Sequence, residues 1–413
     1  MKLKLSAVMF LGLSVAMLQG TPAHAQTGEG SIFHVVPTPN GNKFNSGLFA
    51  ASASSANDIW AVGDSTIHFD GTKWTAFPAP LINGQLTADL QGVVDISPTL
   101  AWAVGNVTLG ANPGQIIERW NGTKWSLFPN PTLLPNSQGD LFAITSTSAT
   151  DIWAVGNLVQ QVVGGALSFN LFEHWDGKAW TPTFINDNTF QALTGVSADS
   201  PNDAWAVGWV APLSAGSNEP LAIHWNGTNW VSAVTPHVGG GANELNAVLA
   251  LAPNDVWAVG FSTPDAPPQQ SATLTLIEHF DGTSWTVVPS PNVGPHSVNQ
   301  SNRLLGLTAN SANDIWAFGS FFAADGSGHQ MTLLLHWDGI SWKVVSSPNP
   351  SKGESPSNLL WAGVAPSPGN IWILGSGEEG TLAIHTAPGG DSNFVSSFSI
   401  TGATRSAETV SPR

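Results

Sequence analysis

The chain of 413 residues carries 28 acidic and 12 basic residues, a formal net charge of −16 at pH 7. So acidic a protein repels phosphate backbones, which excludes nucleic acid as its partner. The chain has no cysteine, which excludes disulfides, thiol catalysis and cysteine-ligated metals, and its 43 Gly and 29 Pro beside 19 Trp indicate an all-β fold of short strands and tight turns.

The first 25 residues have the features of a secretory signal peptide. Lys2 and Lys4 form a basic start, residues 5–18 are apolar, and residues 23–25 are a small-x-small cleavage site, Ala-His-Ala. The apolar run is too short for a stable membrane span. We therefore expect cleavage near Ala25 and a secreted, periplasmic or cell-surface bacterial protein. The mature chain would hold 10 basic and 28 acidic residues.

The rest of the chain is built on a Trp-rich repeat of about fifty residues. Its anchor is a Trp in a motif close to Asn-Asp-Ile-Trp-Ala-Val-Gly, at Trp60, Trp102, Trp153, Trp205, Trp257, Trp316 and Trp372. A motif close to His-Trp-Asp-Gly-Thr-x-Trp follows six anchors and ends at Trp74, Trp125, Trp180, Trp230, Trp285 and Trp342. Seven such repeats predict one seven-bladed β-propeller over residues 26–400. Residues 401–413 are expected to form a flexible tail.

A first strand precedes each anchor. Every repeat has Leu twelve residues before the anchor Trp and Ala or Gly ten residues before it. Because side chains two residues apart point to the same face of a strand, we expect one face to alternate a large apolar residue with a very small one. This pattern suits inner strands that crowd around the axis of a ring.

Four strands per repeat are expected, called A to D, and the C–D turn carries Asp-Gly or Asn-Gly, a strong hairpin signal. The seventh repeat lacks strand D. Residues 33–40, Phe-His-Val-Val-Pro-Thr-Pro-Asn, closely match residues 285–292. We therefore expect the N-terminal segment to complete the last blade, which closes the ring and removes an open sheet edge. Residues 394–400 are the alternative.

The Asp-Gly-Thr-x-Trp hairpin and the Trp-Ala-Val-Gly strand resemble the repeats of bacterial propellers related to the kelch and Asp-box groups. Kelch repeats carry a paired Gly and a Tyr, whereas here the Gly is single, as at Gly63, and Tyr is absent. The resemblance implies the architecture and assigns no catalytic residue.

Most of the repeated side chains are interpreted as scaffold. The thirteen anchor and hairpin Trp residues are expected to pack between blades, with partners for their indole N–H groups. Ring symmetry separates the equivalent His and Asp residues, so we expect hydrogen bonds in turns and blades rather than a metal site. These positions hold His68, Arg119, His174, His224, His279, His336 and His385, and Asp58, Asp151, Asp203, Asp255 and Asp314.

The variable B–C loops and the connections between blades share one face, where binding is expected because such loops sit on a rigid scaffold. At the channel mouth on that face, the residues on either side of the strand-A Leu differ from blade to blade. Trp209 and Trp361 also depart from the repeat. The candidate ligand-binding residues are Asp89, Gln91, Asp140, Glu244, Asn246, Arg303, Trp209 and Trp361. A solvated entrance without a ligand is the alternative.

No nucleophile–base or metal-spaced constellation is recognisable. Sialidase-like sites need an arginine cluster and a tyrosine, and copper-radical oxidases need a Tyr–Cys cofactor; the chain has four Arg and neither Tyr nor Cys. The sequence therefore favours a monomeric binding or scaffold propeller that recognises a protein or a glycan outside the cytoplasm. A metal-assisted hydrolase or lyase at the channel mouth, with calcium held by acidic and Asn side chains, is the alternative.

Overall fold

A computed structural model describes residues 31–39, 46–80, 88–107, 114–186, 189–212, 216–264, 272–294, 301–323, 328–351 and 357–386. The predicted signal peptide, the alternative closing segment and the predicted tail lie outside these residues. All the secondary-structure elements in the described part are β-strands. No helix in that part is therefore long and apolar enough to cross a membrane.

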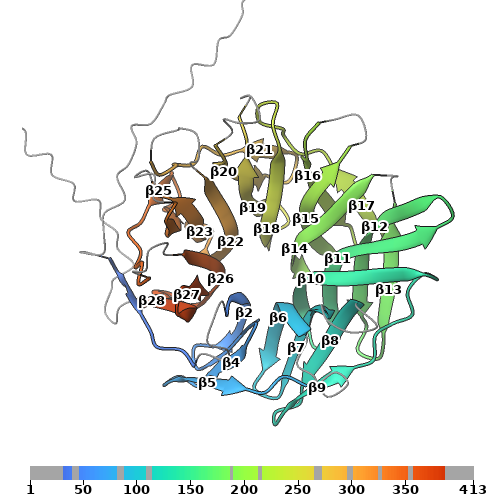
Figure 1. Cartoon of the computed structure of the whole chain (residues 1–413), viewed down its shortest axis with the longest axis horizontal. Coiled ribbons are helices and arrows are strands. Elements are labelled where there is room, and N and C mark those ends of the chain that lie inside the picture. The colour runs from blue at the N-terminus through green and yellow to red at the C-terminus, as the bar shows by residue number, and fades with distance from the viewer. Residues whose placement is uncertain are drawn as a thin grey trace, which may run out of the picture.

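The strands form seven antiparallel sheets of four strands, arranged as blades around a central axis (Figure 1). Blade 1 contains β2 (Leu48–Ser55), β3 (Asp58–Gly63), β4 (Thr66–Phe69) and β5 (Trp74–Phe77). Blade 2 contains β6 (Ala88–Ser97), β7 (Leu100–Val107), β8 (Gly114–Trp120) and β9 (Trp125–Phe128). Blade 3 contains β10 (Ser137–Ser148), β11 (Asp151–Val162), β12 (Gly165–Trp175) and β13 (Trp180–Ile185).

The remaining blades repeat this order. Blade 4 contains β14 (Phe190–Ser200), β15 (Asp203–Ala211), β16 (Glu219–Trp225) and β17 (Trp230–Ala233). Blade 5 contains β18 (Asn243–Ala252), β19 (Asp255–Ser262), β20 (Leu274–Phe280) and β21 (Trp285–Val287). Blade 6 contains β22 (Asn302–Ser311), β23 (Asp314–Phe322), β24 (Gln330–Trp337) and β25 (Trp342–Val344). Blade 7 contains β26 (Asn358–Ser367), β27 (Asn370–Gly377), β28 (Gly380–Thr386) and β1 (Phe33–Val35).

The N-terminal strand closes the ring, as predicted. β1 pairs antiparallel with β28, with Phe33 opposite Thr386 and Val35 opposite Ile384. Beyond the strand, the hydroxyl groups of Thr38 and Thr381 are hydrogen-bonded at 2.7 Å. The closing segment thus supplies the fourth strand that the seventh repeat lacks, and the seven-bladed, all-β prediction is confirmed.

Aromatic rings fill the space between blades. In six interfaces the anchor Trp of one blade meets the hairpin Trp of the next nearly edge-on; Trp60 and Trp125, for example, have ring centroids 5.0 Å apart and planes at 87°. In the interface before blade 7, Phe33 takes the place of the hairpin Trp and lies 5.3 Å from Trp316. The predicted packing role of these residues is confirmed, and the closing strand reproduces it.

The first strand of every blade contains a β-bulge that was not predicted from the sequence. In blade 1, Leu48 pairs with Gly63 and Ala50 pairs with Val62, so Phe49 between them is an extra residue. Leu48 packs toward the preceding blade, whereas Ala50 packs toward the following one. Our expectation that the large and the small residue share a face was therefore wrong, because the extra residue reverses the alternation.

The single glycine of the Trp-Ala-Val-Gly motif allows this bulge. A Cβ atom on Gly208 would lie 1.9 Å from the carbonyl oxygen of Ala192, and the equivalent distance for Gly63 to Gly47 is 2.1 Å. All seven motif glycines approach the same carbonyl within this range. Backbone contact this close leaves no space for any side chain.

We predict that Gly208→Ala destabilises the propeller by about 3 kcal/mol, because the new methyl group forces the bulge carbonyl out of place. Gly165→Ala is the control, since a Cβ atom there meets nothing within 4 Å. Urea unfolding followed by Trp fluorescence measures both variants. Equal stability of the two variants would contradict the role assigned to the motif glycine.

Candidate functional site

The A–B and C–D turns form one face of the propeller, and their local hydrogen bonds recur from blade to blade. In blade 1, the Asp70 carboxylate accepts hydrogen bonds from the backbone N–H groups of Thr72 and Lys73 at 2.9 and 3.0 Å. These bonds and that of the Thr72 hydroxyl, the largest cause, lower the pKa of Asp70 to about 2. Asn121 and Asn226 hold the same turn in blades 2 and 4. The turn interpretation of these Asp and Asn residues is confirmed.

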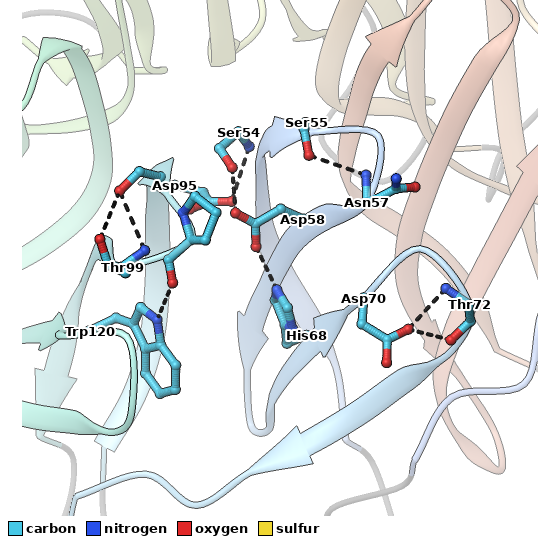
Figure 2. Close-up of polar contacts among 12 residues, drawn as sticks. Ser54, Ser55, Asn57, Asp58, His68, Asp70, Thr72, Asp95, Thr99 and Trp120 are labelled. Atoms are coloured by element: carbon cyan, nitrogen blue, oxygen red, sulfur yellow. Dashed lines mark hydrogen bonds and ion pairs between the residues drawn. The ribbon is translucent and has the colours of Figure 1, made fainter.

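The repeated His and Asp side chains form a pair within each blade that has both. In blade 1, Nε2 of His68 lies 2.6 Å from Oδ1 of Asp58, and the same carboxylate bonds the Ser54 hydroxyl at 2.5 Å (Figure 2). The equivalent pairs are His174–Asp151, His224–Asp203, His279–Asp255 and His336–Asp314. The predicted hydrogen-bonding role of these residues is confirmed.

The two blades without the Asp show what the pair does. In blade 7, His385 bonds Oδ1 of Asn370 at 2.8 Å. In blade 2, where Leu100 takes the Asp position, Arg119 replaces the His and lies 5.3 Å from the Trp102 ring. The constant element is thus a polar side chain stacked on the anchor Trp, which agrees with a scaffold role.

Indole N–H groups were expected to have partners, and this was only partly right. Trp257 and Trp316 donate to Oδ1 of Asp255 and Asp314 at 2.8 and 2.9 Å. The indole nitrogens of the other five anchors and of all six hairpin Trp residues have no acceptor within the described structure, so the prediction fails for eleven of the thirteen. Edge-to-face aromatic packing therefore outweighs hydrogen bonding at these positions.

A channel of about 630 Å³ runs between the first strands of the seven blades. The bulge places one residue of each blade in its lining, and these residues differ around the ring: Phe49, Gln91, Phe142, Thr194, Asn246, Leu305 and Trp361. Gln91, Asn246 and Trp361 among the predicted site residues therefore share one cavity. Because the residues flanking the bulge are constant, the lining varies without disturbing the blades.

Two polar residues of the lining also join neighbouring blades. The Thr194 hydroxyl lies 2.7 Å from the carbonyl oxygen of Leu245, and the Asn246 amide donates to the carbonyl of Leu304 at 2.7 Å. Each bond reaches the first strand of the following blade. Thr194 and Asn246 thus hold the channel wall rigid while exposing part of their surface to it.

The four charged residues predicted beside the channel lie at the starts of β6, β10, β18 and β22, outside the lining set. Asp140 is hydrogen-bonded to the Asn106 side chain, and its pKa is raised by burial. Glu244 accepts a bond from the Asn218 amide at 2.7 Å.

Asp89 lies opposite Asn106 in the β6–β7 ladder. Arg303 stacks over the Phe261 ring at 4.4 Å. The predicted set is therefore divided between the wall and the rim of the channel.

Trp209 lies apart from the channel. Its ring is 5.7 Å from that of Phe190, which is 51% exposed. Phe190 borders a smaller hollow of about 230 Å³, which Val159 and residues 166–168 near the turn of the β11–β12 hairpin also line. Trp209 and Trp361 thus belong to two separate places on the variable-loop face.

Three buried glutamates were not predicted from the sequence. Glu118, Glu173 and Glu278 are fully buried between blades, in a third-strand position filled in the other blades by Ile67, Ile223, Leu335 and Ile384. Burial raises the pKa of Glu118 and Glu278 to about 8 and that of Glu173 to about 7. Only Glu173 is bonded to a side chain, Gln115, at 2.5 Å. The sequence signal for these residues is a Glu at a repeat position that holds Ile or Leu in the other blades.

The structure groups no acidic or histidine side chains in threes that could hold a metal ion, as far as the described residues go. The Asp140 and Glu244 carboxylates are each fixed by an asparagine amide instead. Calcium binding and the metal-assisted reaction therefore stay predictions, as does ligand contact by the eight candidate residues.

The chain matches no protein-family model and no curated protein sequence. Among solved structures it is similar to YCF48 bound to D1 peptide, with 16% identity, a TM-score of 0.54, and 89% of this chain and 99% of that chain covered. YCF48 from Cyanidioschyzon merolae matches with 15% identity, a TM-score of 0.52, and 86% and 98% covered. The WD40 propeller domain of Doa1 matches with 11% identity, a TM-score of 0.51, and 86% and 98% covered.

At these identities the similarity shows the fold. The chain is a seven-bladed propeller that resembles the YCF48 and WD40 types. The resemblance to the kelch and Asp-box groups stays a prediction.

We predict that Glu278→Leu stabilises the protein at neutral pH by about 1–3 kcal/mol, because it removes a buried polar group without a partner. The folded-state pKa of about 8 lies above the ordinary value of 4.5. The folded protein therefore holds the extra proton, and this glutamate lowers stability progressively as pH rises from about 4.5 to about 8.

Thermal melts across this range compare the wild type with Glu278→Leu and with Glu219→Gln, which changes an exposed acid. The Leu variant should lose part of the decline with pH, and the Gln variant should retain it. An unchanged pH profile in the Leu variant would show that Glu278 ionises normally in the fold.

Proposed function

We propose that this protein is a non-enzymatic binding propeller that recognises a segment of a partner protein at its variable-loop face. One observation carries the proposal. The blades repeat the same scaffold contacts, whereas the bulge residue facing the channel varies, with six residue types among the seven blades. A cavity with a constant frame and an individual lining is the usual form of a recognition site on a repeat scaffold.

The size and chemistry of the channel support this proposal. Its volume of about 630 Å³ falls within the common range for ligand pockets. The lining combines aromatic rings with a few amide and hydroxyl groups, a mixture that favours specific binding. The β11–β12 hairpin and the exposed Phe190 extend the apolar surface of the same face.

The comparisons add support of a general kind. The matched YCF48 structure contains a bound D1 peptide, so a propeller of this architecture can hold a protein segment. We also propose that binding takes place outside the cytoplasm, on the strength of the signal-peptide features of residues 1–25.

We predict that the mature protein enriches a related set of sequences from a random-peptide phage library. Gln91→Trp places a large ring in the channel and should abolish binding of the enriched peptides. Lys178→Trp, on an exposed C–D turn of the opposite face, should bind them as the wild type does.

Binding is measured by biolayer interferometry, with the melting temperature of each variant as a check on folding. The proposal fails if no peptide is enriched, or if the folded Gln91→Trp variant retains full affinity. A glycan array run in parallel distinguishes a glycan receptor, which would also contradict the proposal.

A further inference from the structure

The channel has an aromatic wall on blades 6, 7 and 1. Trp361 and Phe49 meet edge-to-face at 5.7 Å, and Leu305 and Phe318 continue the same wall. Phe318 occupies a position that is Val or Leu in the other blades. Its ring fits because two neighbours are glycines: Cβ atoms on Gly306 and Gly363 would lie 2.3 and 2.6 Å from it. Phe318 is 1% exposed and therefore supports this wall from behind.

The wall formed by blades 2, 4 and 5 is polar, with Gln91, Thr194 and Asn246. In their hydrogen bonds to the next blade, Thr194 uses its single O–H and Asn246 uses one of its two side-chain N–H groups. The oxygen atoms of these two side chains can still accept hydrogen bonds. The polar wall therefore offers acceptors to a bound group.

The rim above these walls is negatively charged. Asp140 and Glu244 stand two residues before the lining residues Phe142 and Asn246 on the same strands. Their bonds come from neutral asparagine amides, and neither carboxylate forms an ion pair with a described residue. Arg303 is the one Lys or Arg that the described residues place on this face, because the others lie on or beside the C–D turns.

We propose that the channel receives a basic side chain, arginine or lysine, from the partner segment; this inference rests on the proposed function. The flat or alkyl part of that side chain packs on Trp361 and Phe49, where a cation is attracted to the ring faces. Its charged end bonds the acceptors of the polar wall and is attracted to the rim carboxylates. The net charge of −16 steers such a segment toward the protein.

The test uses N-acetyl-arginine amide as the probe and its uncharged isostere N-acetyl-citrulline amide as the comparison. The readout is the indole N–H signal of Trp361 in a heteronuclear NMR spectrum, assigned by its loss in Trp361→Phe. The arginine probe should shift this signal in a saturable way, and the citrulline probe should leave it in place. Rising salt should weaken the effect.

Variants of the rim carboxylates and of the aromatic pair test separately the contributions of charge and of ring packing to probe binding. Glu244→Gln and Asp140→Asn should each weaken the arginine probe by about two- to fivefold, the range of an exposed ion pair. Glu219→Gln, the same change on an outer strand of this face, should have no effect. Phe49→Leu should also weaken binding, because it removes half of the aromatic pair.

Equal shifts by arginine and citrulline, or a response to methyl glucoside in their place, would overturn the basic side chain as the ligand. So would unchanged affinity in both rim variants with melting temperatures like that of the wild type. If the phage library instead yields channel-binding peptides without basic residues, the proposed function stands and this inference falls.

Discussion

The close contact between the motif glycine of each second strand and the backbone of the first strand is the constraint on which the rest depends. At Gly156, a Cβ atom would lie 1.9 Å from the Asp140 carbonyl oxygen. This contact admits the extra residue of the bulge, and the bulge turns the following small residue toward the next blade. The same extra residue faces the axis. One backbone requirement therefore builds the blade interfaces and presents a variable residue to the channel.

Stability and recognition are consequently assigned to different residues. Anchor Trp, His and Asp side chains repeat because each interface has the same geometry, and their contacts are local to one blade or one interface. The channel-lining residues lie outside these contacts and therefore vary between blades. The buried glutamates are the exception, since Glu118 and Glu278 place a polar group where packing alone calls for Ile or Leu. They reduce the stability of two interfaces without reaching the channel or the surface.

Much of the architecture could be predicted from the sequence because the same repeat occurs seven times. The number of blades, the turn residues and the closing strand all follow from repeated letters, and Phe33 even aligns with the hairpin Trp285 whose packing it imitates. The bulge could not be seen, since a Leu and an Ala two residues apart look like plain alternation. For the same reason Asp140 and Gln91 looked like neighbours in one pocket, whereas they lie at its rim and in its wall. The burial of Glu173 was not predicted, because glutamate is usually exposed and only the Ile or Leu at the same position of other blades indicates a buried site.

The seam between β1 and β28 has a consequence for how the chain acquires its structure during synthesis. The bond between Thr38 and Thr381 joins residues 343 positions apart, so the first strand to leave the ribosome must wait for the last. Until then blade 7 offers an unpaired edge and blade 6 lacks the ring of Phe33 against Trp316. Blades in the middle of the chain can form from local pairings, but cooperativity around the ring arises only at closure. Closure of the ring therefore depends on a contact between the two ends of the propeller segment.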